Sequence, residues 1–262
     1  MSSCRHSSSA KRCLDNARWH SVNMFTVSDS VHSIEPNSAR LSSRLNELFP
    51  PGALTAELRG AGDPAALYTE EARHLQRAVP TRTEEFAAGR LCARLLLGEF
   101  GIHNFPIEVG AHRQPLWPET LVGSITHTTG FCAAVAAPKN CLRALGLDTE
   151  ITGGVKTELW RSICTPAETA WLGSLPDSEQ PAAATLIFSA KEAFYKCQFA
   201  LTQERLGFHD ATVELPAWGQ KRGAFRIRAN RSIQLERHAA LPLQGQYLFH
   251  EQFITSGMAL ET

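Results

Sequence analysis

The sequence predicts a mixed α+β fold, because two long helical segments alternate with short strand-like segments. Residues 84–100 carry regularly placed apolar side chains and are followed by Gly101, a helix stop signal. Residues 182–201 are rich in apolar side chains and contain no glycine or proline. Each half of the chain therefore offers a long helix with several strands, which permits a structural duplication without establishing one.

Strands are expected between the two long helices. Residues 121–137 predict two short strands around the turn 127–130, and proline in the segment 114–118 favours an extended or turn conformation before them. Residues 138–143 then lead into a mostly apolar strand that ends at Asp148 and Glu150. The first half of the chain is thus a helix followed by strands.

A helix start is predicted at Thr165, where Thr165 and Glu168 form a capping box and Pro166 takes the first helical position. This pattern gives Glu168 a structural role. Three more strands are expected after the second long helix, around residues 211–215, 225–228 and 246–254.

Composition narrows the class of protein. The chain has 262 residues, which is long enough for one large domain or two small ones. It carries 26 basic and 26 acidic side chains. Neutral overall charge disfavours a general binder of nucleic acid or membrane surfaces.

No apolar segment reaches the roughly 20 residues that span a bilayer. The seven cysteines are scattered and odd in number, so neither disulfides nor a structural zinc are expected, and a reducing cytoplasm fits best.

The first segment, residues 1–23, is polar and basic without a signal-peptide core, and we expect a disordered extension. Met24 begins more ordinary sequence. Translation starting at Met24 is therefore an alternative to Met1.

Two pairs of charged residues carry the chemistry. Asp148 and Glu150 point to the same side of a strand, because alternate side chains share a face. Glu192 and Lys196 are four positions apart and are neighbours on a helix. Magnesium binds through one or two protein oxygens, keeps several waters and takes further oxygens from substrate phosphates. The pairs together predict a metal and phosphate site in an enzyme.

A structural explanation competes with this one. A Glu–Lys pair at this spacing is often a surface ion pair that contributes roughly 0.2–0.5 kcal/mol. Both pairs, however, lie in apolar surroundings, residues 142–147 and 186–195. Charged groups in such surroundings are expected to be paired or to bind ions, which favours the site.

Three blocks of sequence resemble the 4'-phosphopantetheinyl transferases of the large two-lobed type that activates surfactin and enterobactin synthetases. The blocks are Gly123–Gly130 (GSITHTTG), Leu145–Glu150 (LGLDTE) and Phe188–Lys196 (FSAKEAFYK). An upstream block, Gly89–Arg94 followed by Gln114–Pro118, resembles the enterobactin branch. The likeness spans roughly residues 70–210, and ordered motifs of this kind are a specific signal.

The resemblance implies two similar α+β lobes related by pseudo-twofold symmetry, with the active site in the cleft between them. The N-terminal lobe would cover residues 24–140 and the C-terminal lobe residues 141–262. The implied reaction transfers the phosphopantetheine arm of coenzyme A to a serine of an apo carrier protein, depends on magnesium, and releases adenosine 3',5'-bisphosphate.

The resemblance also assigns roles. Asp148, Glu150 and Glu192 match the metal ligands, and Asp148 also belongs to the coenzyme A site. Glu192 matches the general base that takes the serine proton, directly or through a water. Lys196 matches the group that contacts coenzyme A and donates to the leaving bisphosphate.

Further matches concern coenzyme A itself. His127, with Thr126 beside it, and Arg90 match groups that contact its phosphates, whereas Arg94 is equally explained as a helix-surface charge. The family's lysine before the proline is replaced here by Gln114, so Arg113 is expected to supply that charge. His74 and Arg77 fall near the family's basic pair for the 3'-phosphate, in sequence too variable to align.

Two other functions remain open. A magnesium-dependent nuclease also uses acidic residues with a Glu–Lys element, although neutral composition disfavours a phosphate-backbone binder. A non-catalytic module that binds coenzyme A or a carrier protein would not need a base and an acid beside a metal.

The carrier itself is not specified by the motifs. Acyl, peptidyl and aryl carriers of fatty-acid, polyketide, nonribosomal-peptide and siderophore pathways are all compatible with the resemblance. Two lobes in one chain make a monomer the expected state.

Overall fold

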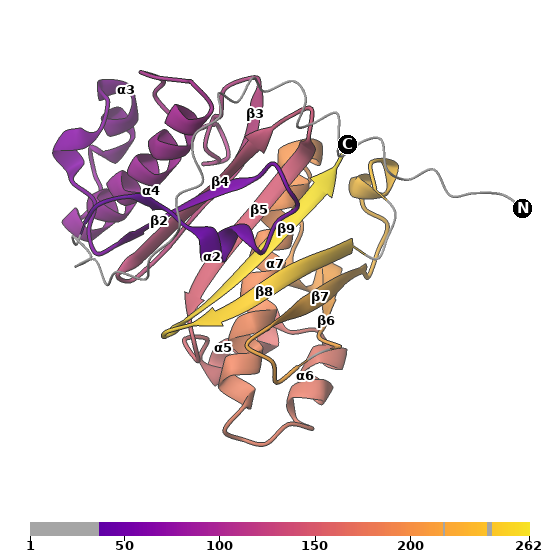
Figure 1. Ribbon diagram of the computed structural model, residues 1–262. Coiled ribbons are helices and arrows are strands. Elements are labelled where there is room, and N and C mark those ends of the chain that lie inside the picture. The colour runs from indigo at the N-terminus through magenta and orange to yellow at the C-terminus, as the bar shows by residue number, and fades with distance from the viewer. Residues whose placement is uncertain (1–36, 217, 240–242) are drawn as a thin grey trace, which may run out of the picture.

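A computed structural model describes residues 37–216, 218–239 and 243–262. The expected disordered extension 1–23 and the choice between Met1 and Met24 lie outside these residues. The predicted α+β class is confirmed: two antiparallel sheets are each covered by one long helix (Figure 1). Within the described part of the chain, no helix is both long and apolar enough to cross a membrane.

The first sheet is built from the N-terminal half of the chain and has the strand order β1-β2-β4-β3. Its strands are β1 (Arg40–Leu41), β2 (Leu54–Arg59), β3 (Leu121–Thr128) and β4 (Phe131–Pro138). The helix α4 (Pro80–Glu99) packs on β4 and β2. The predicted pair of strands within 121–137 is therefore β3 and β4, joined at a turn where Gly130 has a φ of 76°.

The second sheet belongs to the C-terminal half and has the order β5-β9-β8-β7-β6. Its strands are β5 (Leu142–Ile151), β6 (Ala211–Glu214), β7 (Arg222–Ala229), β8 (Leu243–His250) and β9 (Phe253–Glu261). The helix α7 (Gln180–Thr202) packs against β5 and β9 and lies behind this sheet in Figure 1.

The structure also contains shorter helices. They are the α-helices α2 (Ser43–Asn46), α3 (Thr69–Ala72), α5 (Thr157–Ile163) and α6 (Pro166–Leu172), and the 3₁₀ turns η1 (Pro64–Ala66), η2 (Arg73–Leu75), η3 (Phe208–Asp210) and η4 (Gln234–Arg237). The capping box predicted at Thr165 is confirmed at the start of α6, where the Glu168 backbone N–H donates to the Thr165 hydroxyl.

The two sheets meet where β3 lies beside β5. Hydroxyl groups of β3 bridge the strands: the Leu147 N–H donates to Ser124 Oγ over 3.1 Å and the Thr149 N–H to Thr126 Oγ1 over 2.9 Å. Side chains of β3 thus bond to the backbone of β5. This junction brings Thr126 of the first half next to Asp148 of the second.

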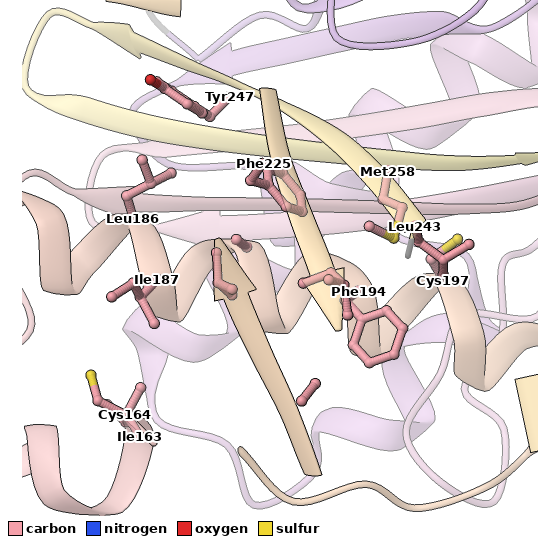
Figure 2. Packing of buried hydrophobic residues seen from close by; sticks show 14 of the residues in the cluster. Ile163, Cys164, Leu186, Ile187, Phe194, Cys197, Phe225, Leu243, Tyr247 and Met258 are labelled. Carbon is pink, nitrogen blue, oxygen red and sulfur yellow. The ribbon is translucent and has the colours of Figure 1, made fainter. Parts of the chain in front are cut away.

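A close helix–strand contact fixes the position of α7. A Cβ atom at Gly146 of β5 would lie 1.8 Å from the carbonyl oxygen of Ala193, so only glycine fits there. Figure 2 shows the core beneath the sheet, where Leu186 and Phe194 of α7 pack with Phe225 and other buried residues. Since Ala193 follows Glu192 directly, this contact also fixes where Glu192 stands relative to β5.

Some expectations were wrong in detail. The segment 246–254 is not one strand but parts of β8 and β9, separated by a turn at Glu251, which has a φ of 54°. The first long helix begins at Pro80, earlier than predicted, because proline suits the first helical turn. Cys141 is disulfide-bonded, contrary to the expectation from scattered cysteines.

Candidate active site

A cavity of about 750 Å³ lies between the two halves of the molecule. Every site residue expected from the sequence lines it, although those residues come from α4, β3, β5, α7 and a loop. His74 and Arg77, which could not be aligned, line it as well, together with Arg82. The predicted set is Arg90, Arg113, Thr126, His127, Asp148, Glu150, Glu192 and Lys196.

Asp148 is the most buried of the three predicted metal ligands, with 4% of its surface exposed. Its Oδ1 accepts hydrogen bonds from Lys196 Nζ at 2.7 Å and from Thr126 Oγ1 at 3.4 Å. Its Oδ2 is buried and has no hydrogen-bond partner. A buried carboxylate oxygen without a partner is costly, and a cation in the cavity would satisfy it.

Glu150 and Glu192 complete a cluster of negative charge around Asp148. Burial raises the pKa of Glu150 to about 7, and repulsion from Asp148 adds to the rise. Burial also raises the pKa of Glu192, against the attraction of Lys196. The charged form of both carboxylates is therefore disfavoured, and a nearby cation would stabilise it.

The donor set fits magnesium. No group of three or more acidic, imidazole or thiol side chains forms a ready-made metal cage among the residues that the structure describes. Magnesium does not require one, since it binds through one or two carboxylates and completes its shell with water and substrate phosphates. The unpartnered Oδ2 of Asp148 and the raised pKa of both glutamates identify oxygen atoms that a hard cation would stabilise.

Metal-free protein is expected to lose stability as the pH rises through about 7. The pKa of Glu150 is raised from 4.5 to about 7, so the folded state keeps a proton that the unfolded state releases. The contribution of this proton to folding stability is complete below a pH of about 4.5, the pKa in the unfolded state. It is lost as the pH rises through about 7, the pKa in the folded state. Between a pH of about 5 and about 8, the Tm of the wild type should therefore fall relative to that of Glu150→Gln. A constant difference in Tm would contradict this assignment.

Lys196 lies between Asp148 and the open cavity. It donates to Asp148 Oδ1 and, at 3.0 Å, to the carbonyl oxygen of Leu147. Its ion-pair partner is thus Asp148 on β5, not Glu192 one turn earlier on its own helix. The surface-pair explanation of Glu192 and Lys196 is therefore wrong.

The imidazole of His127, on β3, lines the same cavity. Its Nδ1 lies 3.5 Å from Glu85 Oε2, and its Nε2 contacts the Arg82 guanidinium. Burial lowers the pKa of His127, and the Arg82 cation lowers it further. Arg82 and Glu85 were missed by the sequence analysis, and Arg82 lies in the first turns of α4, before residue 84 where the predicted helix began.

The two arginines of α4 have different environments. Arg90 lines the cavity, is 6% exposed, donates from Nε to the Ile107 carbonyl oxygen and stacks on the Phe86 ring at 3.9 Å. Burial lowers its pKa to about 10, so it stays cationic at neutral pH. Arg94 instead packs over the Tyr68 ring at 4.7 Å and lies 3.7 Å from Glu71.

Gln114 stands where the family resemblance led us to expect a lysine, and its side chain does not line this cavity. The Gln114 side chain folds back into its own loop, where Oε1 accepts from the His112 N–H at 2.9 Å. A Cβ at Gly110 would lie 2.5 Å from Gln114 Nε2, so glycine makes room for this amide. Gln114 therefore shapes the loop, and Arg113 is the residue that lines the cavity.

Comparison with known proteins shows to which family the chain belongs. A model of the 4'-phosphopantetheinyl transferase N-terminal domain matches residues 70–137, and a model of the 4'-phosphopantetheinyl transferase superfamily matches residues 144–249. The 4'-phosphopantetheinyl transferase Svp of Streptomyces mobaraensis is 38% identical over 173 residues, which are 63% of this chain and 69% of that protein. The chain belongs to the 4'-phosphopantetheinyl transferase family. It is accordingly an enzyme of this transferase class.

Two further relatives are matched over smaller shares. The 4'-phosphopantetheinyl transferase PptT of Mycobacterium tuberculosis is 38% identical over 55% of this chain and 63% of its own length. Enterobactin synthase component D of Salmonella typhi is 41% identical over 44% of this chain and 47% of its own length.

Both matched segments of this phosphopantetheinyl transferase contribute to the cavity. The segment 70–137 supplies the arginines, His127 and Thr126, and the segment 144–249 supplies the three predicted metal ligands and Lys196. The cationic wall and the acidic wall of the cleft thus come from different halves of the chain.

Proposed function

We propose that the cleft transfers the phosphopantetheine arm of coenzyme A to a serine of an apo carrier protein, with magnesium, and releases adenosine 3',5'-bisphosphate. One observation carries this proposal: a single cavity joins a wall of cationic side chains to a cluster of three carboxylates. Coenzyme A has phosphates at two places, and only its pyrophosphate needs a metal. A cationic wall with an acidic end suits such a ligand.

The cationic wall would hold the phosphates. Arginine binds phosphate through paired N–H groups, and the described cavity offers Arg82, Arg90 and Arg113 for this role. The buried Arg90 is held by Ile107 and Phe86, so its guanidinium loses little side-chain entropy on binding. His74 and Arg77 extend the same wall and are proposed for the 3'-phosphate.

Asp148, Glu150 and Glu192 would hold the magnesium ion. When bound, magnesium offsets the charge that builds on the phosphate oxygens during transfer. The three side chains supply oxygen atoms only, which are the ligands magnesium prefers.

Glu192 is proposed to take the proton of the carrier serine as its oxygen bonds to phosphorus. Its raised pKa brings this carboxylate nearer to neutral pH, where a general base is most effective. The bond between phosphorus and the bridging oxygen of the pyrophosphate then breaks. Lys196 would donate to the departing phosphate, because an ammonium has three N–H groups and two of them already bond Leu147 and Asp148.

Lys196→Ala is expected to lower kcat by about 100-fold while changing the affinity for coenzyme A only slightly, since a donor to the leaving group acts in the transition state. Steady-state kinetics with varied coenzyme A separates the two quantities. Lys221→Ala, at an exposed position outside the cavity, is the matched control. An unchanged kcat with a raised KM would show that Lys196 only binds substrate.

Mass spectrometry of apo carrier proteins tests the proposed function. Several apo carriers are incubated with enzyme, coenzyme A and magnesium, and the bisphosphate product is quantified by chromatography. We expect one phosphopantetheine per carrier and an equal amount of product. Cleavage of DNA with magnesium, without modification of any carrier, would support the nuclease alternative. Binding of coenzyme A without transfer would support the non-catalytic module.

The partner is proposed to be a carrier domain of a nonribosomal-peptide, polyketide or fatty-acid synthase. Relatives named as enterobactin synthase components favour a siderophore pathway among these. A cytoplasmic location and a monomeric enzyme stay predictions.

A further inference from the structure

A short hairpin, residues 108–116, lines both the active-site cleft and a second cavity next to it; we call it the strap. The Leu116 N–H donates to the Glu108 carbonyl oxygen at 3.0 Å, the Gly110 N–H donates to that of Gln114 at 2.8 Å, and Val109 pairs with Pro115. These bonds close the hairpin on itself. The strap belongs to the N-terminal half of the chain.

The tip of the strap reaches the C-terminal half. The His112 ring meets the Phe199 ring edge-on, with centroids 5.6 Å apart and an interplanar angle of 89°. His112 Nδ1 lies 2.9 Å from Arg205 Nη2. Because a guanidinium can only donate, Nδ1 is the acceptor of this hydrogen bond. Phe199 lies in the last turn of α7, and Arg205 follows that helix.

Arg113 is next to this contact and faces both cavities. It lines the cleft and also the second cavity, which measures about 500 Å³ and is largely apolar. Its φ of 67° is unusual for a residue with a side chain, and its N–H donates to the Gly110 carbonyl oxygen. The direction of the Arg113 guanidinium thus depends on where the strap lies, and the tip contact is what ties the strap to the second half.

We propose that His112 is a positioning residue for coenzyme A, which it does not itself touch. By holding Phe199 and Arg205, it keeps the strap across the two halves and so keeps Arg113 directed into the cleft. The inference rests on the proposed function, in which Arg113 binds a phosphate of coenzyme A. Glu192 and Lys196 stand on α7, which its own contacts with β5 hold in place, so we expect the chemical step to be unaffected.

His112→Ala is expected to weaken coenzyme A binding by about tenfold, the size of a partly lost charge-assisted hydrogen bond, and to leave kcat within about twofold. The affinity is read by calorimetric titration with coenzyme A, which does not require transfer. Arg205→Ala should have the same effect through the other partner, and it keeps the test available if His112→Ala folds poorly. His103→Ala, at an exposed histidine outside both cavities, is the control.

The decisive comparison repeats His112→Ala in an Arg113→Ala background. If His112 acts through Arg113, the second substitution should weaken coenzyme A binding no further than Arg113→Ala alone. An equal loss of affinity in both backgrounds would show general loosening and overturn the proposal, as would unchanged affinity in His112→Ala. Absence of transfer by the wild type would instead contradict the proposed function.

Discussion

Asp148→Asn is expected to abolish metal-dependent transfer, with a loss of at least about 1000-fold, because a metal that stabilises transferring phosphate contributes several kcal/mol. The substitution preserves the shape of the side chain but removes its charge. The unpartnered Oδ2 becomes a weaker ligand or is replaced by an amide nitrogen. The rate is measured by carrier modification at saturating coenzyme A, over a magnesium titration.

The fold should survive this change. Lys196 keeps its bond to the Leu147 carbonyl oxygen, and a neutral amide can still accept from Lys196 and Thr126. Circular dichroism and Tm therefore check that the loss is not unfolding. Asp177→Asn changes the same residue type in a surface loop away from the cavity and serves as the control. A wild-type rate in Asp148→Asn would remove Asp148 from the metal site.

Glu168→Ala is expected to cost about 3–5 kcal/mol of folding free energy, the range found when one partner of a buried ion pair is removed. Glu168 is 3% exposed and accepts three bonds: from Lys191 Nζ at 2.7 Å, from the Thr165 N–H at 2.6 Å and from the Val213 N–H at 2.6 Å. Its loss leaves a buried ammonium and unpaired N–H groups. For a chain of this size, Tm should fall by on the order of 10 °C.

Thermal unfolding of matched variants tests this account. Glu158→Ala, an exposed glutamate on α5, should leave Tm almost unchanged. Replacing both partners, as in Glu168→Met with Lys191→Met, should restore part of the loss, because no buried charge is then left unpaired. An unchanged Tm in Glu168→Ala would mean that the pair does not stabilise the fold.

Much of the site follows from local sequence. Asp148 and Glu150 share a strand face and Glu192 and Lys196 share a helix face, so spacing alone brings each pair together. The capping role of Glu168 also follows from spacing. The backbone N–H and the hydroxyl of Thr165, three residues earlier, are the two groups that Glu168 bonds in the capping box. Its ion pair with Lys191, however, joins residues 23 positions apart and no local pattern contains it.

The rest depends on tertiary contacts. The last strand, β9, was only partly anticipated, because Ser256 and Gly257 interrupt its apolar pattern, although both residues are buried and pair with β5 and β8. Gln114 gives no signal of its role until Gly110 is seen beside it. The contact of His112 with Arg205 spans 93 positions and depends entirely on how the two halves meet.

The dependence of transfer on metal can be measured with a single preparation of enzyme. Purified enzyme is freed of metal with a chelator, mixed with coenzyme A and an apo carrier protein, and followed by mass spectrometry before and after magnesium is restored. We predict no modified carrier in the chelator and one phosphopantetheine arm per carrier after magnesium is added. Transfer at full rate in the chelator would contradict the account, as would failure of magnesium to start transfer on any carrier tested.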